Sequence, residues 1–233
     1  MSLLKEIKDS LLHLAFPHVC QGCGTSNLQA DHLLCLQCLA SLPETNYHLY
    51  PDNPIEKKFW GRMQTVHATA QYYFTKESMM QHLMHQFKYK GNKEIGIYLG
   101  KLVGHALVSS KRFSDVNALV PLPLHRSKEH RRGYNQAVIL CDGISSVLNK
   151  PVWKDVVSRR EFTETQTKKN RIERWQNMEG KFELMNTGKI ESSHLLLVDD
   201  VITTGATLEA CGGELLKAKN VRLSVATLCF SFH

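Results

Sequence analysis

The stretch from Leu195 to Thr207 constrains the fold more than any other part of the chain. It reads LLLVDDVITTGAT, so four apolar residues are followed by two aspartates and then by a turn rich in threonine. The apolar run over 195–198 predicts a buried strand, and the apolar spacing over 207–217 predicts a helix. Because ligands bind at the carboxyl ends of strands in open α/β sheets, the aspartates and the turn are predicted to form a ligand site.

The turn from Thr203 to Thr207 has the composition of a phosphate-binding site. Gly205 allows the backbone to approach a ligand closely or to adopt a positive φ angle, and the start of the next helix offers free amide groups and partial positive charge. Asp199 and Asp200 would repel a nearby phosphate unless a cation or sugar hydroxyls intervene. A phosphorylated ribose with a bound magnesium ion satisfies both requirements. The alternative is a capped helix beside two solvated aspartates.

The rest of the chain predicts an α/β fold with a mostly parallel sheet flanked by helices, because short apolar strands alternate with helical patterns. The predicted strands are 65–74, 118–120, 152–157, 195–198 and 221–228, and the predicted helices are 78–87, 94–108, 134–148 and 207–217. We expect three parts: an N-terminal helix and cysteine module over 1–45, a proline-containing linker over 46–60, and the large domain over 61–233.

Four of the seven cysteines form two CxxC pairs separated by eleven residues, at Cys20, Cys23, Cys35 and Cys38. Two such pairs can supply four thiolates to a tetrahedral structural zinc ion. A short module with a small hydrophobic core needs a metal ion of this kind to stabilise its fold. Disulfides are the alternative, although reducing compartments disfavour them.

Composition limits the classes of protein without selecting one. Hydrophobic residues make up 42% of the chain and charged residues 22%, which is ordinary for a soluble globular protein. The formal net charge of +7 favours anionic partners, meaning nucleic acid, anionic membrane or phosphorylated small molecules. The N-terminal segment is amphipathic and no apolar run is long enough to span a bilayer, so we expect a cytoplasmic protein without membrane insertion.

Several motifs together resemble known families. The stretch over 195–207 resembles the phosphoribosyl-pyrophosphate (PRPP) motif of type I phosphoribosyltransferases. The CxxC pairs, FKYKGN at 87–92, VPLPLHRSKEHRRGYNQA at 120–137 and RREFTETQTKKNRIERWQN at 159–177 resemble, in the same order, the competence-associated, amidophosphoribosyltransferase-like ComF family. The resemblance runs from about residue 14 to about residue 228.

This resemblance implies roles for particular residues. Asp199 and Asp200 would hold the ribose hydroxyls, and Thr203, Thr204, Gly205, Ala206 and Thr207 would wrap the 5-phosphate. The cation-rich segment over 120–136 would be the pyrophosphate loop, with Leu124, His125 and Arg126 as its site residues, and a solvated basic loop before a helix is the alternative. The basic segment would supply a flexible lid with Arg160, Gln166, Arg171 and Arg174, and Arg174 would join the two aspartates as a catalytic residue. A plain surface hairpin or a nucleic-acid patch is the alternative for that segment.

The expected function is therefore that of a pentosyltransferase in nucleotide metabolism. It would bind PRPP with magnesium and transfer the 5-phosphoribosyl group to an acceptor, releasing pyrophosphate. A variable region over 61–89 would determine the acceptor, although no chemistry can be assigned to it. The alternative is a non-catalytic DNA-uptake protein that binds single-stranded DNA or a competence helicase partner, because clustered lysine and arginine suit backbone phosphates.

Overall fold

The computed structural model describes residues 19–26, 28, 32–160 and 181–231. Its helices and strands follow in this order: α2 (Leu36–Ala40), η1 (Tyr47–Leu49), α3 (Pro54–Lys57), β1 (Ala68–Phe74), α4 (Met79–Tyr89), α5 (Lys93–Ser109), β2 (Ala118–Pro121), α6 (Arg126–Arg132), α7 (Gln136–Leu148), β3 (Val157–Arg159), β4 (Phe182–Leu184), α9 (Thr187–Ile190), β5 (His194–Ile202), α10 (Ala206–Leu215) and β6 (Arg222–Ser231).

Four strands form a wholly parallel sheet in the order β1-β6-β5-β2, as the alternating sequence pattern predicts. The register pairs Leu197 of β5 with Val120 of β2 on one side and with Val225 of β6 on the other. Parallel strands need crossover connections, which α4–α5, α7 and α10 provide. The α/β fold class is thus confirmed.

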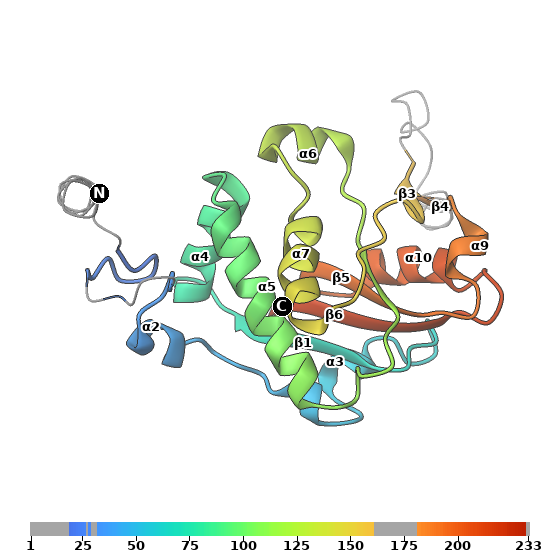
Figure 1. Ribbon diagram of the computed structural model, residues 1–233, viewed down its shortest axis with the longest axis horizontal. Coiled ribbons are helices and arrows are strands. Elements are labelled where there is room, and N and C mark those ends of the chain that lie inside the picture. Colours follow the sequence, from blue (N-terminus) through green and yellow to red (C-terminus); the bar gives the residue numbers. More distant parts are fainter. Residues whose placement is uncertain (1–18, 27, 29–31, 161–180, 232–233) are drawn as a thin grey trace, which may run out of the picture.

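Helices lie on both faces of the sheet (Figure 1), and a cluster of buried hydrophobic residues lies on each face. Leu196 and Val198 of β5 belong to the cluster that includes α4, α5 and α7, whereas Leu195 and Leu197 belong to the cluster with α3 and α10. This division follows from the geometry of a strand, in which successive side chains point to opposite faces. The near-continuous apolar character of β5 is explained by burial on both faces.

Helices α5 and α7 pack unusually closely where each carries a glycine. A Cβ atom on Gly100 would come within 2.5 Å of the Leu140 carbonyl oxygen, and one on Gly143 within 2.3 Å of the Ile97 carbonyl oxygen. Only glycine permits this approach. The contact fixes α7, and with it the chain that enters α7 from α6.

The cysteine module and the predicted linker both pack against the sheet domain. Cys20 and Cys38 are buried in the same cluster as Tyr72 of β1. Within 46–60, η1 and α3 form, and Phe59 is fully buried in the cluster with α10. The three predicted domain boundaries stay predictions, but 46–60 is a packed segment.

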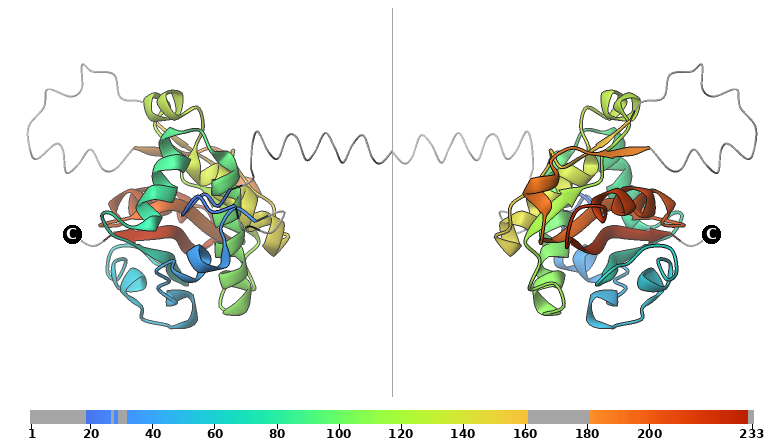
Figure 2. Two further views of the ribbon diagram at one scale, coloured as in Figure 1. Left: turned by 90° about the vertical axis from the view of Figure 1, so that its left-hand side faces the viewer. Right: turned by 90° about the vertical axis from the view of Figure 1, so that its right-hand side faces the viewer.

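One predicted strand differs in the structure. The stretch 152–157 was predicted as a single strand, whereas only Val152 bridges to β2, through Leu119. The chain then leaves the sheet, and β3 pairs antiparallel with β4 as a separate hairpin. Figures 1 and 2 show that this hairpin and α6 rise from the same end of the molecule. Among the described residues, no helix has the length and apolar character required to cross a membrane.

Candidate functional site

The acidic pair lies inside the second half of β5 and not after its end. The strand continues to Ile202, and Asp199 is paired in register with Thr227 of β6. Asp200 faces the α4 side of the sheet, where its Oδ2 atom lies 2.9 Å from Lys88 Nζ. The backbone N–H of Asp200 donates to Asp199 Oδ1 over 2.8 Å, so the two aspartates form one unit.

Burial raises the pKa of Asp199 to about 8, and the neighbouring negative charge of Asp200 adds to the rise. The backbone hydrogen bond from Asp200 and the positive charges of Lys88 and Arg132 oppose it. Burial also lowers the pKa of Arg159, while the negative charge of Asp199 acts in the other direction. The Asp199 carboxyl group therefore interacts electrostatically with three cations that come from separate motifs, namely Lys88, Arg132 and Arg159.

The turn after β5 has the conformation that its sequence predicts. Gly205 has a φ angle of 81° and forms the N-cap of α10. A glycine cap offers no side-chain oxygen to the amides of the first turn, and only a long hydrogen bond of 3.4 Å joins the Ala206 N–H to Thr204 Oγ1. These amides can therefore donate to a phosphate oxygen. Thr204 and Thr207 are exposed, which leaves the turn open to a ligand.

The segment between α3 and β1 supports this turn. A Cβ atom on Gly205 would lie 3.2 Å from the ring of Phe59, so the aromatic side chain packs directly beneath the glycine. Arg62 donates to the Thr204 carbonyl oxygen over 3.2 Å and forms an ion pair with Glu209 in the first turn of α10. That pairing offsets a negative charge which would otherwise face a bound phosphate.

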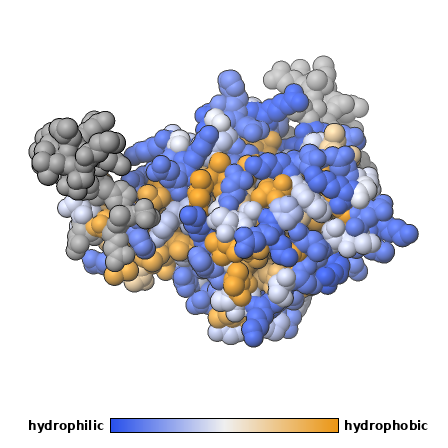
Figure 3. Space-filling model, in the orientation of Figure 1, coloured by the Kyte–Doolittle hydropathy of each residue, from blue (hydrophilic) through white to orange (hydrophobic). Residues whose placement is uncertain are grey.

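The predicted pyrophosphate loop lies between β2 and α6. His125 caps α6 by accepting a hydrogen bond from the Ser127 backbone N–H, and Leu124 is half-buried beside it. The Leu122 N–H donates to the Val198 carbonyl oxygen, so the loop begins at the edge of the sheet where β5 carries its aspartates. Arg126 is exposed in the first turn of α6, and hydrophilic residues cover this end of the molecule (Figure 3).

Most of the predicted lid lies outside the described residues, including Gln166, Arg171 and Arg174. Arg160 lies at its described border, where Nε pairs with Glu183 Oε2 at 3.0 Å on the surface. Arg159 and Phe182 are directly paired in the β3–β4 hairpin, so the two ends of the segment are adjacent.

Two cations near the acidic pair were missed as site residues in the sequence. Lys88 falls within 61–89, to which no chemistry was assigned, and Arg132 lies within the basic segment 120–136 predicted as the pyrophosphate loop but was not named there as a site residue. Both occur in the quoted motifs FKYKGN and HRRGYN, so the signal was present. Both residues are far from Asp200 in the sequence, so the sequence did not reveal that they lie near the acidic pair in space.

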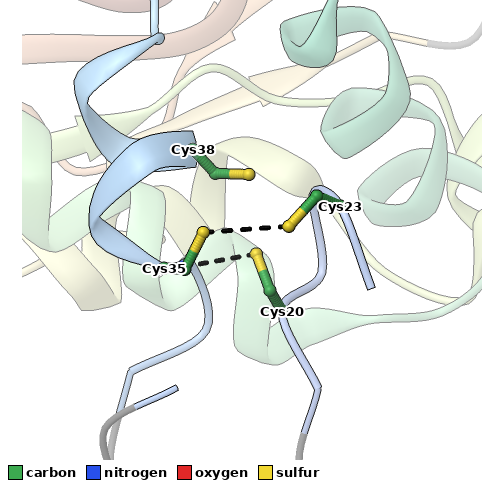
Figure 4. A group of neighbouring side chains, drawn as sticks. All are labelled: Cys20, Cys23, Cys35 and Cys38. Carbon is green, nitrogen blue, oxygen red and sulfur yellow. Dashed lines mark hydrogen bonds between the residues drawn. The ribbon is translucent and has the colours of Figure 1, made fainter. Parts of the chain in front are cut away.

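The four cysteines form a compact cluster (Figure 4). Their sulfur atoms all lie within 4.8 Å of one another, and Cys23 Sγ is 3.8 Å from Cys35 Sγ. A tetrahedral zinc ion with four Zn–S bonds near 2.3 Å separates its sulfur ligands by about 3.8 Å. This distance excludes a disulfide between that pair, and the four thiols are free. The cluster can therefore hold one metal ion such as zinc.

Backbone amides assist the cluster. The N–H groups of Gly22 and Cys35 donate to Cys20 Sγ over 3.4 and 3.2 Å. Although burial acts to raise the pKa of Cys20, these backbone hydrogen bonds, together with that of Cys23, lower it to about 6. Metal ligation requires thiolates, so a lowered pKa at one position favours it.

Comparison with known proteins first defines the class. A model of the phosphoribosyl transferase domain matches residues 134–232, which include β5, the turn and α10. The parallel sheet, its covering helices and this match define a type I phosphoribosyltransferase fold, to which an N-terminal four-cysteine cluster is attached.

Proteins that are similar over most of this chain then define the family. DNA utilization protein YhgH of Escherichia coli strain K12 is 30% identical over 93% of this chain and 92% of its own length. Competence protein F of Haemophilus influenzae is 31% identical over 83% of this chain and 76% of its own. Competence protein ComFC of Bacillus subtilis is 30% identical over 86% and 85%, respectively. The chain belongs to the ComF family.

Proposed function

We propose that this protein binds PRPP with Mg²⁺ at the end of β5 and transfers its 5-phosphoribosyl group to an acceptor. The observation that carries the proposal is the open glycine turn before α10, next to an acidic pair surrounded by cations. The turn suits an anion, the aspartates suit hydroxyls or a hard cation, and the surrounding cations suit a second anionic group.

Each part of PRPP then has a partner of matching chemistry. The amides of α10 and the hydroxyls of Thr204 and Thr207 would hold the 5-phosphate. Asp199 and Asp200 would accept hydrogen bonds from the ribose hydroxyls. Mg²⁺ is usually bound by one or two carboxylates together with substrate phosphates, so this acidic pair fits the ion, which would neutralise charge on the diphosphate.

The transfer requires little covalent chemistry from the protein. An acceptor nucleophile forms a bond to C1 of the ribose while the bond from C1 to the diphosphate oxygen breaks, and pyrophosphate leaves with the electron pair. The protein would orient the sugar, exclude water and stabilise the negative charge of the leaving group. The predicted lid around Arg174 would serve the second of these tasks.

We further propose that the cysteine cluster holds a structural zinc ion. Four thiolates complete the tetrahedron and leave no position for a water molecule, so the metal would stabilise the fold without taking part in transfer.

A second function is suggested by the names of the relatives, which refer to DNA utilization and competence. The surface of α6, which includes Lys128, Arg131 and Arg132 within one short helix, favours binding of single-stranded DNA. A partner in DNA uptake would then use the same basic end of the molecule. This function and PRPP binding are compatible, and they differ in their need for the aspartates.

Titration of the full-length protein with PRPP and Mg²⁺, and separately with single-stranded DNA, tests the proposal. We expect Asp199→Ala/Asp200→Ala to lower PRPP affinity by at least about 30-fold, because the two carboxyl groups that would hydrogen-bond the ribose hydroxyls are lost. Asp142→Ala, which removes an exposed aspartate of α7, is the matched control and should leave PRPP affinity unchanged. If wild type binds no PRPP, or if the double variant binds it equally well, the proposed function is wrong. Pyrophosphate release with candidate acceptors then tests turnover.

A further inference from the structure

We infer that Lys88 and Arg132 bind the diphosphate of PRPP, and that Lys88 leaves Asp200 to do so when the sugar binds. This inference rests on the proposed function. It adds Lys88, which lies outside the basic segment 120–136 predicted for pyrophosphate, and assigns a role within that segment to Arg132.

Lys88 forms an ion pair with Asp200 in the site. Its Nζ atom lies 2.9 Å from Asp200 Oδ2, and the side chains are only 17% and 13% exposed, respectively. A ribose hydroxyl or Mg²⁺ that approaches Asp200 competes with this ammonium group. An ammonium left in a poorly solvated place without an anion is costly, so Lys88 needs a new anionic partner once Asp200 is occupied.

Arg132 has unused hydrogen-bonding capacity close by. Its Nη1 donates to Gln136 Oε1 over 2.6 Å, and the guanidinium lies over the ring of Tyr89. Its Nε is buried and has no hydrogen-bond partner among the described residues. Buried donors are nearly always paired in folded proteins, so an unpaired one near an anion site indicates a missing ligand. The positive charges of both Arg132 and Lys88 act on Asp199, which places them around the same carboxylates.

The protein fixes these two cations relative to each other. Tyr134 Oη donates to the Phe87 carbonyl oxygen, and Lys93 Nζ lies 5.2 Å from the centre of the Tyr134 ring. These contacts tie the end of α4 and the start of α5 to the turn between α6 and α7. Lys88 and Arg132 are therefore presented from two segments that contact each other. Such a pair can hold two phosphate groups of one ligand with little loss of side-chain entropy.

If Lys88 moves from Asp200 to the diphosphate, the site should select PRPP over a sugar phosphate that lacks the diphosphate. PRPP supplies a diol to the aspartates and a diphosphate to the released Lys88. Ribose 5-phosphate supplies the diol and the 5-phosphate but no diphosphate, so it must displace Lys88 from Asp200 without offering Lys88 a new anionic partner. Lys88 therefore favours PRPP and disfavours the sugar phosphate that lacks the leaving group.

Calorimetric titration of full-length wild type, Lys88→Gln and Arg132→Gln tests this, with PRPP, pyrophosphate and ribose 5-phosphate as three probes in the presence of Mg²⁺. We expect Lys88→Gln to weaken PRPP and pyrophosphate by at least about tenfold, the loss expected for one charged hydrogen bond. The affinity for ribose 5-phosphate should stay equal or rise, because Asp200 is free. Arg132→Gln should weaken PRPP and pyrophosphate without a rise in ribose 5-phosphate affinity.

Lys90→Gln, which removes an exposed lysine two residues away, is the matched control. Lys88→Arg, which keeps the charge, should recover most of the PRPP affinity and guards against a loss caused by misfolding. An equal loss for PRPP and ribose 5-phosphate in Lys88→Gln, or no loss for either, would overturn the inference while leaving PRPP binding established. If wild type binds none of the three probes, the proposed function fails as well.

Discussion

Asp199 is paired in register with Thr227 of β6 and bonded through Oδ1 to the next backbone amide. Burial and the charge of Asp200 raise its pKa to about 8, whereas an aspartate in the unfolded chain titrates near 4. Between these two values the folded protein holds a proton that the unfolded chain has lost. The folded state is therefore progressively destabilised, relative to the unfolded state, as pH rises from about 4 to about 8.

Asp199→Asn removes this titration while keeping the side-chain size and an oxygen that can accept the backbone hydrogen bond. We expect the variant to gain stability relative to wild type as pH rises, by at least about 1 kcal/mol between pH 5 and pH 9. Urea denaturation at both pH values measures the difference. A stability difference that is the same at pH 5 and pH 9 would show that Asp199 does not titrate in this way.

At the scale of elements, the N-cap of α10 and the interior of that helix each contain a glycine, and opposite effects are expected when these two are replaced. Gly205 has positive φ and touches the Phe59 ring, whereas a Cβ atom on Gly213 would meet nothing within 4 Å. We expect Gly205→Ala to cost about 1–3 kcal/mol and to weaken PRPP binding, because the strained turn moves the helix amides. Gly213→Ala, in the helix interior, should instead stabilise by about 0.5–1 kcal/mol.

Thermal denaturation of both variants, together with PRPP titration, measures these effects. Equal stability changes in the two variants would mean that helix propensity alone matters and that the conformation of the turn is unimportant.

Hydrophobic patterns predicted the strands well where hydrophobic clusters cover both faces of the sheet. The strands 65–74, 195–198 and 221–228 correspond to β1, β5 and β6, although β5 runs on through the aspartates to Ile202. Prediction failed at 152–157, because an apolar pattern does not reveal that the chain leaves the sheet after Trp153. The order of strands in the sheet is likewise a tertiary property.

At the scale of the whole molecule, the cysteine module is joined to the helix that carries Lys88. Cys20 and Cys38 share a buried cluster with Met80 of α4, and Gln86 Nε2 donates to the Gln21 carbonyl oxygen over 2.9 Å. Gln86 lies two residues before Lys88. The four-cysteine cluster is therefore placed to stabilise the ligand site as well as the cysteine module.

Cys23→Ser tests whether the metal site stabilises the ligand site. Cys23 is exposed and does not belong to the hydrophobic core cluster, so its replacement leaves that core intact. We expect loss of bound zinc, a Tm lower by at least about 5 °C and weaker PRPP binding, since metal binding supplies folding free energy. Chelator should lower the Tm of wild type in the same way and leave that of the variant unchanged. Zinc retained in the variant, or a Tm that does not respond to zinc removal, would contradict the assignment of a structural metal.

The sequence by itself determined the features that depend on neighbours along the chain. These are the apolar strand before the aspartates, the glycine turn, the start of α10 and the CxxC spacing, because residues a few positions apart fix local backbone geometry. Tertiary structure alone decided that Lys88 pairs with Asp200 and that Phe59 and Arg62 support the turn. Those contacts join residues more than a hundred positions apart, and only the packing of the helices on the sheet brings them together.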